Sequence, residues 1–122
     1  MYEGINTIAL FKDTLTGTGG TTLSDPIDLR DVSKQGNFTL SYLVNGTGGS
    51  TAGTTAFSYL GADTFDGVYR VPSGAGTIGT SGVANANSDK VNFTPVVTPF
   101  MKIKVVCGTS NPSLVTASIN VR

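Results

Sequence analysis

The chain has 122 residues, a length that favours one domain over 1–122, in which 1–23 is an arm or a first strand followed by a loop. Eight Lys and Arg residues balance eight Asp and Glu residues, so the charge indicates neither nucleic acid nor an anionic membrane as a partner. Histidine is absent, which excludes the commonest general base and all His-containing metal sites, and we expect no enzyme activity and no cofactor.

The cysteine count and the N-terminal residues indicate the cellular compartment in which the chain is made. Cys107 is the only cysteine, so no disulfide can form within the chain, and we expect synthesis in a reducing cytoplasm. Residues 1–10 lack the basic start and long apolar core of a secretion signal. No run approaches the roughly 18 to 20 apolar residues that cross a bilayer. We therefore expect neither secretion nor a membrane-embedded chain.

The predicted elements are strands, because apolar and polar residues alternate with a period of two and no long stretch has the apolar spacing of a helix. In chain order they are Thr7 to Lys12, Ile27 to Leu29, Phe38 to Val44, Thr55 to Leu60, Gly67 to Val71, Lys90 to Phe93, Met101 to Cys107 and Val115 to Val121. Three of them alternate most clearly. Their apolar faces are Phe38, Leu40, Tyr42 and Val44; Met101, Ile103, Val105 and Cys107; and Val115, Ala117, Ile119 and Val121.

Long loops rich in Gly and Thr are expected between these strands, at Thr14 to Thr22, Asn45 to Thr54 and Pro72 to Ser88. Their small, uncharged side chains suit contact with another protein better than catalysis. We interpret them as contact arms, with the following glycines as interaction candidates: Gly17, Gly19, Gly46, Gly48, Gly49 and Gly76.

Two antiparallel sheets packed face to face would bury the apolar faces and limit the number of unpaired strand edges. The sequence therefore predicts an all-β fold, an antiparallel β-sandwich or jelly roll of about seven or eight strands with long Gly/Thr-rich loops. A flattened barrel is the alternative.

Charged residues offer two further interpretations. Asp25, Asp28 and Asp31 recur every third residue, a spacing at which loop carboxylates can bind calcium. The favoured interpretation is a solvated turn, because Asp at a turn accepts a hydrogen bond from the backbone two residues on, so we expect no metal. Lys102 and Lys104 share the polar face of one strand and are candidates to pair with carboxylates of a neighbouring subunit.

The aromatic residues and the single cysteine are the remaining candidates for a binding or reactive site. Tyr42, Phe57, Tyr59, Phe65 and Tyr69 would form a stacking platform in a carbohydrate-binding module, although aromatic residues at strand spacing more often pack in a core. Cys107 ends an apolar strand face in a chain without histidine, so we expect a buried structural thiol.

Four ordered segments resemble a known family. They are Ser24 to Arg30 (SDPIDLR), Gly36 to Tyr42 (GNFTLSY), Phe93 to Pro95 leading to Pro99 to Lys104 (FTP, PFMKIK), and Val115 to Ile119 (VTASI). Together they resemble small β-sandwich virion proteins of tailed bacteriophages, including head decoration and auxiliary capsid proteins. The glycine-rich middle of the chain is not covered by the resemblance.

The resemblance implies a capsid decoration or cement protein that binds the outer head surface and stabilises the shell. Its expected partners are the major capsid protein, or another virion protein, and neighbouring copies of itself. Its expected location is the virion, after synthesis in the bacterial cytoplasm. The alternatives are a tail, neck or fibre component of the virion and, from a different class, a carbohydrate-binding module.

Overall fold

A computed structural model describes residues 6–17, 19–30, 38–46, 54–73, 76–81, 87–96, 98–108 and 112–121. This part of the chain contains nine strands and no helix. The strands are β1 (Asn6–Thr16), β2 (Thr21–Leu23), β3 (Ile27–Asp28), β4 (Phe38–Asn45), β5 (Thr55–Ala62), β6 (Thr77–Ser81), β7 (Asn87–Phe93), β8 (Phe100–Cys107) and β9 (Ser113–Val121). Accordingly, no helix in the described residues is long and apolar enough to span a membrane.

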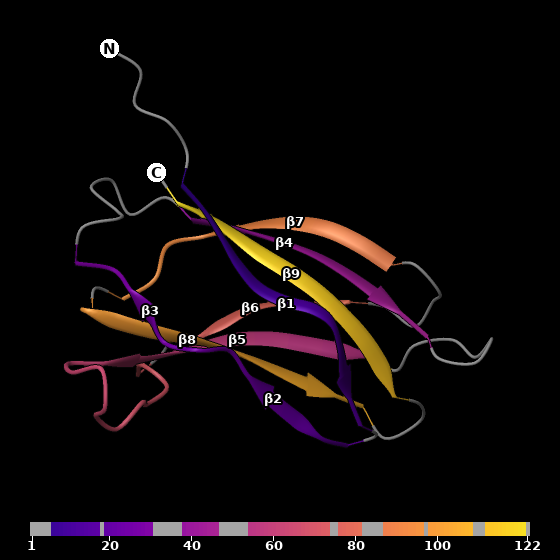
Figure 1. Ribbon diagram of the computed structural model, residues 1–122, viewed down its shortest axis with the longest axis horizontal. Coiled ribbons are helices and arrows are strands. Elements are labelled where there is room, and N and C mark those ends of the chain that lie inside the picture. The colour runs from indigo at the N-terminus through magenta and orange to yellow at the C-terminus, as the bar shows by residue number, and fades with distance from the viewer. Residues whose placement is uncertain are drawn as a thin grey trace, which may run out of the picture.

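The strands form two antiparallel sheets that pack face to face (Figure 1). The first, sheet A, has four strands in the order β1-β9-β4-β7. The second, sheet B, has five, in the order β2-β8-β5-β6 with β3 also paired to β8. Strands distant in sequence are neighbours, as β1 and β9 are in sheet A. The prediction of an all-β antiparallel sandwich is confirmed.

Strand register aligns the apolar positions of neighbouring strands on the inner face of each sheet. In sheet A, Leu40 of β4 lies opposite Ile119 of β9. In sheet B, Ile103 of β8 lies opposite Tyr59 of β5. All three apolar faces that the alternation predicts are buried. The alternation of apolar and polar residues thus identifies the inner face, because successive side chains of a strand point to opposite sides.

The core lies between the two inner faces. Burying a Leu, Ile, Val or Phe side chain contributes about 1.5–3 kcal/mol, so this cluster is the main source of stability in a chain without disulfides. Its buried members are Phe11, Ile27, Phe38, Leu40, Tyr42, Val44, Phe57, Tyr59, Ile78, Met101, Ile103, Val105, Val115, Ala117, Ile119 and Val121.

A small polar cluster joins the two sheets near the last residues of β8. The Thr55 hydroxyl lies 3.0 Å from that of Ser113, and the Cys107 Sγ lies 3.4 Å from the same Ser113 oxygen. Cys107 is a buried thiol, as the sequence predicts. The three side chains bridge sheet B to β9 of sheet A, so they satisfy one another across the interior.

Two of the predicted loops are shorter than expected because they contain strands. β1 continues to Thr16 and β2 begins at Thr21, inside the segment Thr14 to Thr22. β6 lies inside Pro72 to Ser88, whose last two residues already belong to β7. Runs of Thr with Leu or Ile have the β-branched content of strands, and the neighbouring glycines obscured it. Of the third predicted loop, residues 47–53 lie outside the described chain.

The strand predicted at Gly67 to Val71 is wrong. Only Arg70 pairs there, in an isolated bridge with Gly61. Val68 and Val71 are exposed, so their apolar character does not reflect a buried strand face. The segment is part of a long connection between β5 and β6.

Candidate functional site

The connection after β5 exposes an unusual concentration of large apolar side chains. Phe65, Val68 and Val71 are 54%, 68% and 55% exposed. All three belong to residues 63–71, which we term the 63–71 loop. Large apolar side chains that are exposed close together in one short segment can mark a contact site. This loop is therefore the first candidate functional surface.

Hydrogen bonds fix the shape of the 63–71 loop. The Gly67 N–H donates to the Thr64 carbonyl oxygen at 3.1 Å and closes a tight turn at the tip. Gly61 and Arg70 exchange two backbone hydrogen bonds of 2.9 Å at the base. Between them, the Tyr69 hydroxyl donates to the Phe65 carbonyl oxygen at 2.8 Å. The apolar side chains are thus presented on a preformed backbone.

Ring contacts attach the loop to sheet B. The Phe65 ring meets the Phe100 ring edge-on, with centroids 5.9 Å apart. The Lys102 ammonium lies 4.5 Å from the centre of the Tyr69 ring. Such cation–π contacts contribute about 0.5–1 kcal/mol at exposed sites. Lys102 therefore contacts a ring of its own chain, whereas Lys104, opposite Ser58 in the strand register, lies further along β8.

Of the aspartates considered for calcium, Asp28 forms a turn with Arg30. The Asp28 carboxylate accepts hydrogen bonds from Arg30 Nη2 at 2.7 Å, and from Arg30 Nε and the Arg30 backbone N–H, both at 3.0 Å. These bonds, the side-chain bond first, lower the Asp28 pKa from 3.8 to about 2. Asp25 is exposed, and Asp31 lies outside the described residues. Within the described chain no three His, Cys, Asp or Glu residues form a group suited to a metal.

The glycines considered for contact have different surroundings. Gly17 and Gly19 are exposed, and Gly19 adopts a positive φ of 67° while its N–H donates to the Gly108 carbonyl oxygen at 2.8 Å. Gly46 is half-buried after β4. Gly76 is buried with a φ of 110°, and an added Cβ there would lie 2.8 Å from Val71 Cγ1. Gly76 thus shapes the base of the 63–71 loop. Gly48 and Gly49 lie outside the described residues.

The aromatic residues divide between core and surface. Tyr42, Phe57 and Tyr59 are buried, and the Tyr42 and Phe57 rings stack at 4.5 Å. Of the five, only Phe65 and Tyr69 reach the surface, on the 63–71 loop. The platform expected of a carbohydrate-binding module is therefore not assembled by this set.

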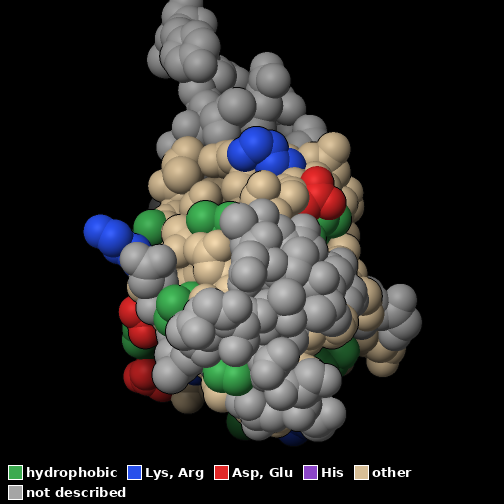
Figure 2. Space-filling model, turned by 90° about the vertical axis from the view of Figure 1, so that its right-hand side faces the viewer, with side chains coloured by type: hydrophobic (Ala, Val, Ile, Leu, Met, Phe, Trp, Pro, Cys, Tyr) green, Lys and Arg blue, Asp and Glu red, His purple; other side chains and the backbone are tan. Residues whose placement is uncertain are grey.

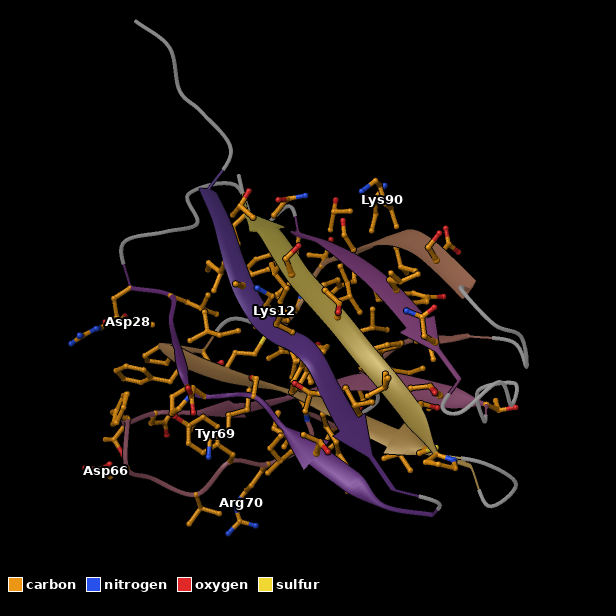
Figure 3. The ribbon with its side chains drawn as sticks, turned by 45° about the vertical axis from the view of Figure 1, so that its right-hand side comes forward. Lys12, Asp28, Asp66, Tyr69, Arg70 and Lys90 are labelled. Carbon is orange, nitrogen blue, oxygen red and sulfur yellow. The ribbon has the colours of Figure 1, made fainter. Side chains whose placement is uncertain are left out.

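A second candidate surface is a hollow of about 660 Å³ on the outer face of sheet A, which we term the sheet A hollow. Small side chains are among its lining residues, including Ala9 of β1 and Ser118 of β9. Lys12 and Lys90 line it from β1 and β7, the two edge strands of the sheet. Figure 3 shows Lys12 over β1 and Lys90 beside β7.

The side of the hollow along β7 also carries an acidic group. Asp89 lines it, and its carboxylate accepts the Lys90 backbone N–H at 2.7 Å. Burial, and secondarily the charge of Asp89, raise the pKa of the adjacent Tyr42. The Lys90 ammonium reaches over the sheet and donates to the Ser41 hydroxyl at 3.2 Å. The hollow therefore has two ammonium groups and one carboxylate.

Outside the hollow, the outer face of sheet A carries a number of uncharged polar side chains. One row crosses all four strands in register, from Thr7 through Asn120 and Thr39 to Asn92. Thr7 donates to Asn120 at 2.8 Å and Thr39 donates to Asn92 at 2.7 Å. Seen from one end of the sandwich, the described surface likewise has only scattered charged side chains (Figure 2). Such a surface provides hydrogen-bonding partners without a strong field.

Sequence reasoning missed the exposed loop and both lysines of the hollow. A signal for the loop was present, because Asp66-Gly67 is a turn dipeptide and argues against a strand at that point. No comparable signal marks Lys12 and Lys90. They are 78 positions apart in the sequence. They line the same hollow only because β1 and β7 pair with the central strands of one sheet.

Comparisons with known proteins give a likeness of fold. No family model matches the chain, and no curated protein matches it in sequence. Among solved structures it is similar to a chain in the structure of infectious bursal disease virus, Gx strain, with a TM-score of 0.55 and 12% identity. The match covers 97% of this chain but 32% of that one, so this chain spans about a third of its neighbour's length. At this identity the likeness shows the fold alone.

Proposed function

We propose that this chain is a structural protein of a tailed-bacteriophage virion, most specifically a decoration protein that binds the outer surface of the head and stabilises the shell. The single observation that carries the proposal is the 63–71 loop, which exposes three large apolar side chains on a backbone fixed by hydrogen bonds. A preformed loop of this kind gains affinity because little conformational entropy is lost on binding.

The fold and the surface support the same role. The β-sandwich resembles a chain from a virus structure over nearly all of this sequence. The net charge is zero, so long-range repulsion between closely packed copies is weak. On a shell with many identical sites, modest affinity per copy suffices for stable attachment. In this role the chain acts by contact, has no catalytic residues and is made in the bacterial cytoplasm before it joins the virion.

Binding to head shells tests the proposal. Purified chain is mixed with expanded shells of the same virus that lack it, and the pellet after centrifugation is analysed on a stained gel. We expect the chain to sediment with the shells and to raise the temperature at which they open. Bovine serum albumin serves as the non-binding control. If the chain stays in the supernatant and the opening temperature is unchanged, the decoration role is wrong.

Copy number separates the head from the tail. A decoration protein is present in numbers comparable to the major capsid protein, whereas a tail, neck or fibre component is present in few copies. The ratio of the two bands on a stained gel of whole virions measures this. A low ratio would replace the decoration role with the tail alternative.

A further inference from the structure

We propose that the 63–71 loop of one copy binds the sheet A hollow of a second copy, with Phe65 over the small residues of the hollow and Asp63 and Asp66 facing Lys12 and Lys90. This contact rests on the proposed function, since it names the partner that a protein packed in many copies offers at that surface. It concerns the contact between neighbouring copies, one of the two kinds of contact that the proposed role requires.

The loop has the chemistry of the inserting partner. Phe65 stands at its tip between two exposed acidic residues, Asp63 two positions before it and Asp66 one position after it. Arg70 at the base is the only basic residue of 63–71, so the loop has one net negative charge. Burial raises the pKa of Tyr69, and the negative charge of Asp66 adds to this rise. The Asp66 carboxylate is therefore close enough to Tyr69 for their charges to interact.

The hollow has the chemistry of the receiving partner. Its lining includes the small residues Ala9, Ser41 and Ser118, beside which an aromatic ring has room. Lys12 and Lys90 are exposed on opposite edge strands of the sheet, separated by three strand spacings. With Asp89 included, the hollow has one net positive charge. Loop and hollow are therefore complementary in charge, and the hollow has a volume of about 660 Å³ to receive a side chain.

The position of the two surfaces requires a second copy. The loop belongs to sheet B, whereas the hollow opens on the outer face of sheet A, away from sheet B. Figure 3 shows Asp66, Tyr69 and Arg70 at one corner of the molecule, well apart from Lys12 and Lys90. A contact between unlike surfaces repeats from copy to copy, so it gives a ring or an open row rather than a closed two-fold dimer.

Charge reversal tests the contact with purified protein. The loop variant is Asp63→Lys/Asp66→Lys, and the hollow variant is Lys12→Glu/Lys90→Glu. Their controls are Asp25→Lys, an exposed aspartate outside the loop, and Thr7→Glu, which adds a negative charge to the outer face of sheet A outside the hollow. All are compared with the unaltered chain by sedimentation velocity at low and high salt. Chemical denaturation confirms that each variant remains folded.

The proposal predicts a specific pattern of association. The unaltered chain and both controls associate at low salt, and less at high salt because exposed charges are screened. Each charge-reversed variant alone associates about tenfold more weakly or not at all. An equal mixture of the two variants regains association, because every loop then meets a hollow of opposite charge. A chain that carries all four reversals does the same.

Three results would overturn the contact: an unaltered chain that stays monomeric, charge-reversed variants that associate as well as it does, or a mixture that fails to recover. The shell-binding experiment is run on the same variants. If they sediment with shells yet do not associate with one another, the contact is wrong and the decoration role stands. If nothing binds shells but the mixture recovers, the contact stands and the decoration role is wrong.

Discussion

Strand β8 and the 63–71 loop have similar apolar residues in opposite environments. In β8, Met101, Ile103 and Val105 are at most 1% exposed. In the loop, Phe65 and Val68 are more than half exposed. The difference lies in backbone pairing. β8 pairs with β5 on one side and with β2 and β3 on the other, whereas the loop pairs only through Arg70.

The comparison teaches that apolar content predicts burial only where neighbouring strands fix the direction of the side chains. A strand hydrogen-bonded on both sides presents one continuous face to the opposite sheet, and its apolar residues are covered. A loop held at its base and tip has no such face. Its apolar residues remain available for contact with another molecule, at little cost to the fold. Changes in β8 should therefore alter stability, and changes in the loop should alter association.

The largest effect is expected for Ile103→Ala. Ile103 is fully buried at the centre of the core, so its truncation should lower the free energy of unfolding by about 2–5 kcal/mol through lost burial and a residual cavity. Chemical denaturation measures the change. Ile103→Val, which removes one methylene, should cost about 0.5–1.5 kcal/mol. A loss for Ile103→Ala within experimental error would mean that the inner face of β8 is misassigned.

A smaller effect is expected where β2 ends beside β8. The buried Ser24 hydroxyl accepts the Ile103 N–H at 2.9 Å and donates to the Asp25 carbonyl oxygen at 3.0 Å. Ser24→Ala leaves a buried N–H without its partner, which costs about 1–3 kcal/mol. Ser24→Thr keeps the hydroxyl and serves as the control. Equal stability of the Ala and Thr variants would show that this hydrogen bond contributes little to the pairing of β8.

The strongly alternating strands could be predicted from sequence because their two faces have different requirements. β4, β8 and β9 bury every second side chain, and a period of two reports this directly. The short strands β2 and β6 were missed because they consist mainly of Thr, Ser and Gly, which are equally typical of loops. A strand was wrongly predicted at Gly67 to Val71 for the opposite reason. Val68 and Val71 are typical of strands, but in the structure they are exposed in a loop.

The candidate surfaces could be predicted only where neighbours in sequence form them. The turn at Asp28 is local, and the expected hydrogen bond from the backbone two residues on is present. The sheet A hollow combines Lys12 with Lys90, and strand order alone brings them to one face. Sequence reasoning without the order β1-β9-β4-β7 has no means of pairing them.

In the loop itself, Phe65→Ala should change stability by less than about 1 kcal/mol. The side chain is 54% exposed and its main contact is one edge-on ring, an interaction of about 0.5–1.5 kcal/mol when well packed. Association between copies should nevertheless fall, as measured by sedimentation velocity. Val68→Ser, the substitution of a more exposed residue, should be neutral for stability. A loss as large as that of Ile103→Ala would make Phe65 a core residue and remove the contrast with β8.

The smallest effect is expected at the turn that follows β3, where Asp28 meets Arg30. Asp28 and Arg30 are 50% and 63% exposed, and the Arg30 ion also lies 5.0 Å from the centre of the Phe100 ring that Phe65 contacts. Because Arg30 lowers the Asp28 pKa to about 2, the pair stabilises the fold at pH values above the ordinary 3.8. That contribution should disappear as the pH falls from about 4 towards 2.

Nuclear magnetic resonance titration of the Asp28 carboxyl carbon measures this pKa directly. We expect a midpoint near 2 in the unaltered chain and a return towards 3.8 in Arg30→Met, which keeps an apolar side chain beside Phe100 but removes the hydrogen bonds from the guanidinium. The backbone N–H of residue 30 still donates to Asp28, so the return should be incomplete. A midpoint near 3.8 in the unaltered chain would mean that solvent screens the pair and that it adds no pH-dependent stability.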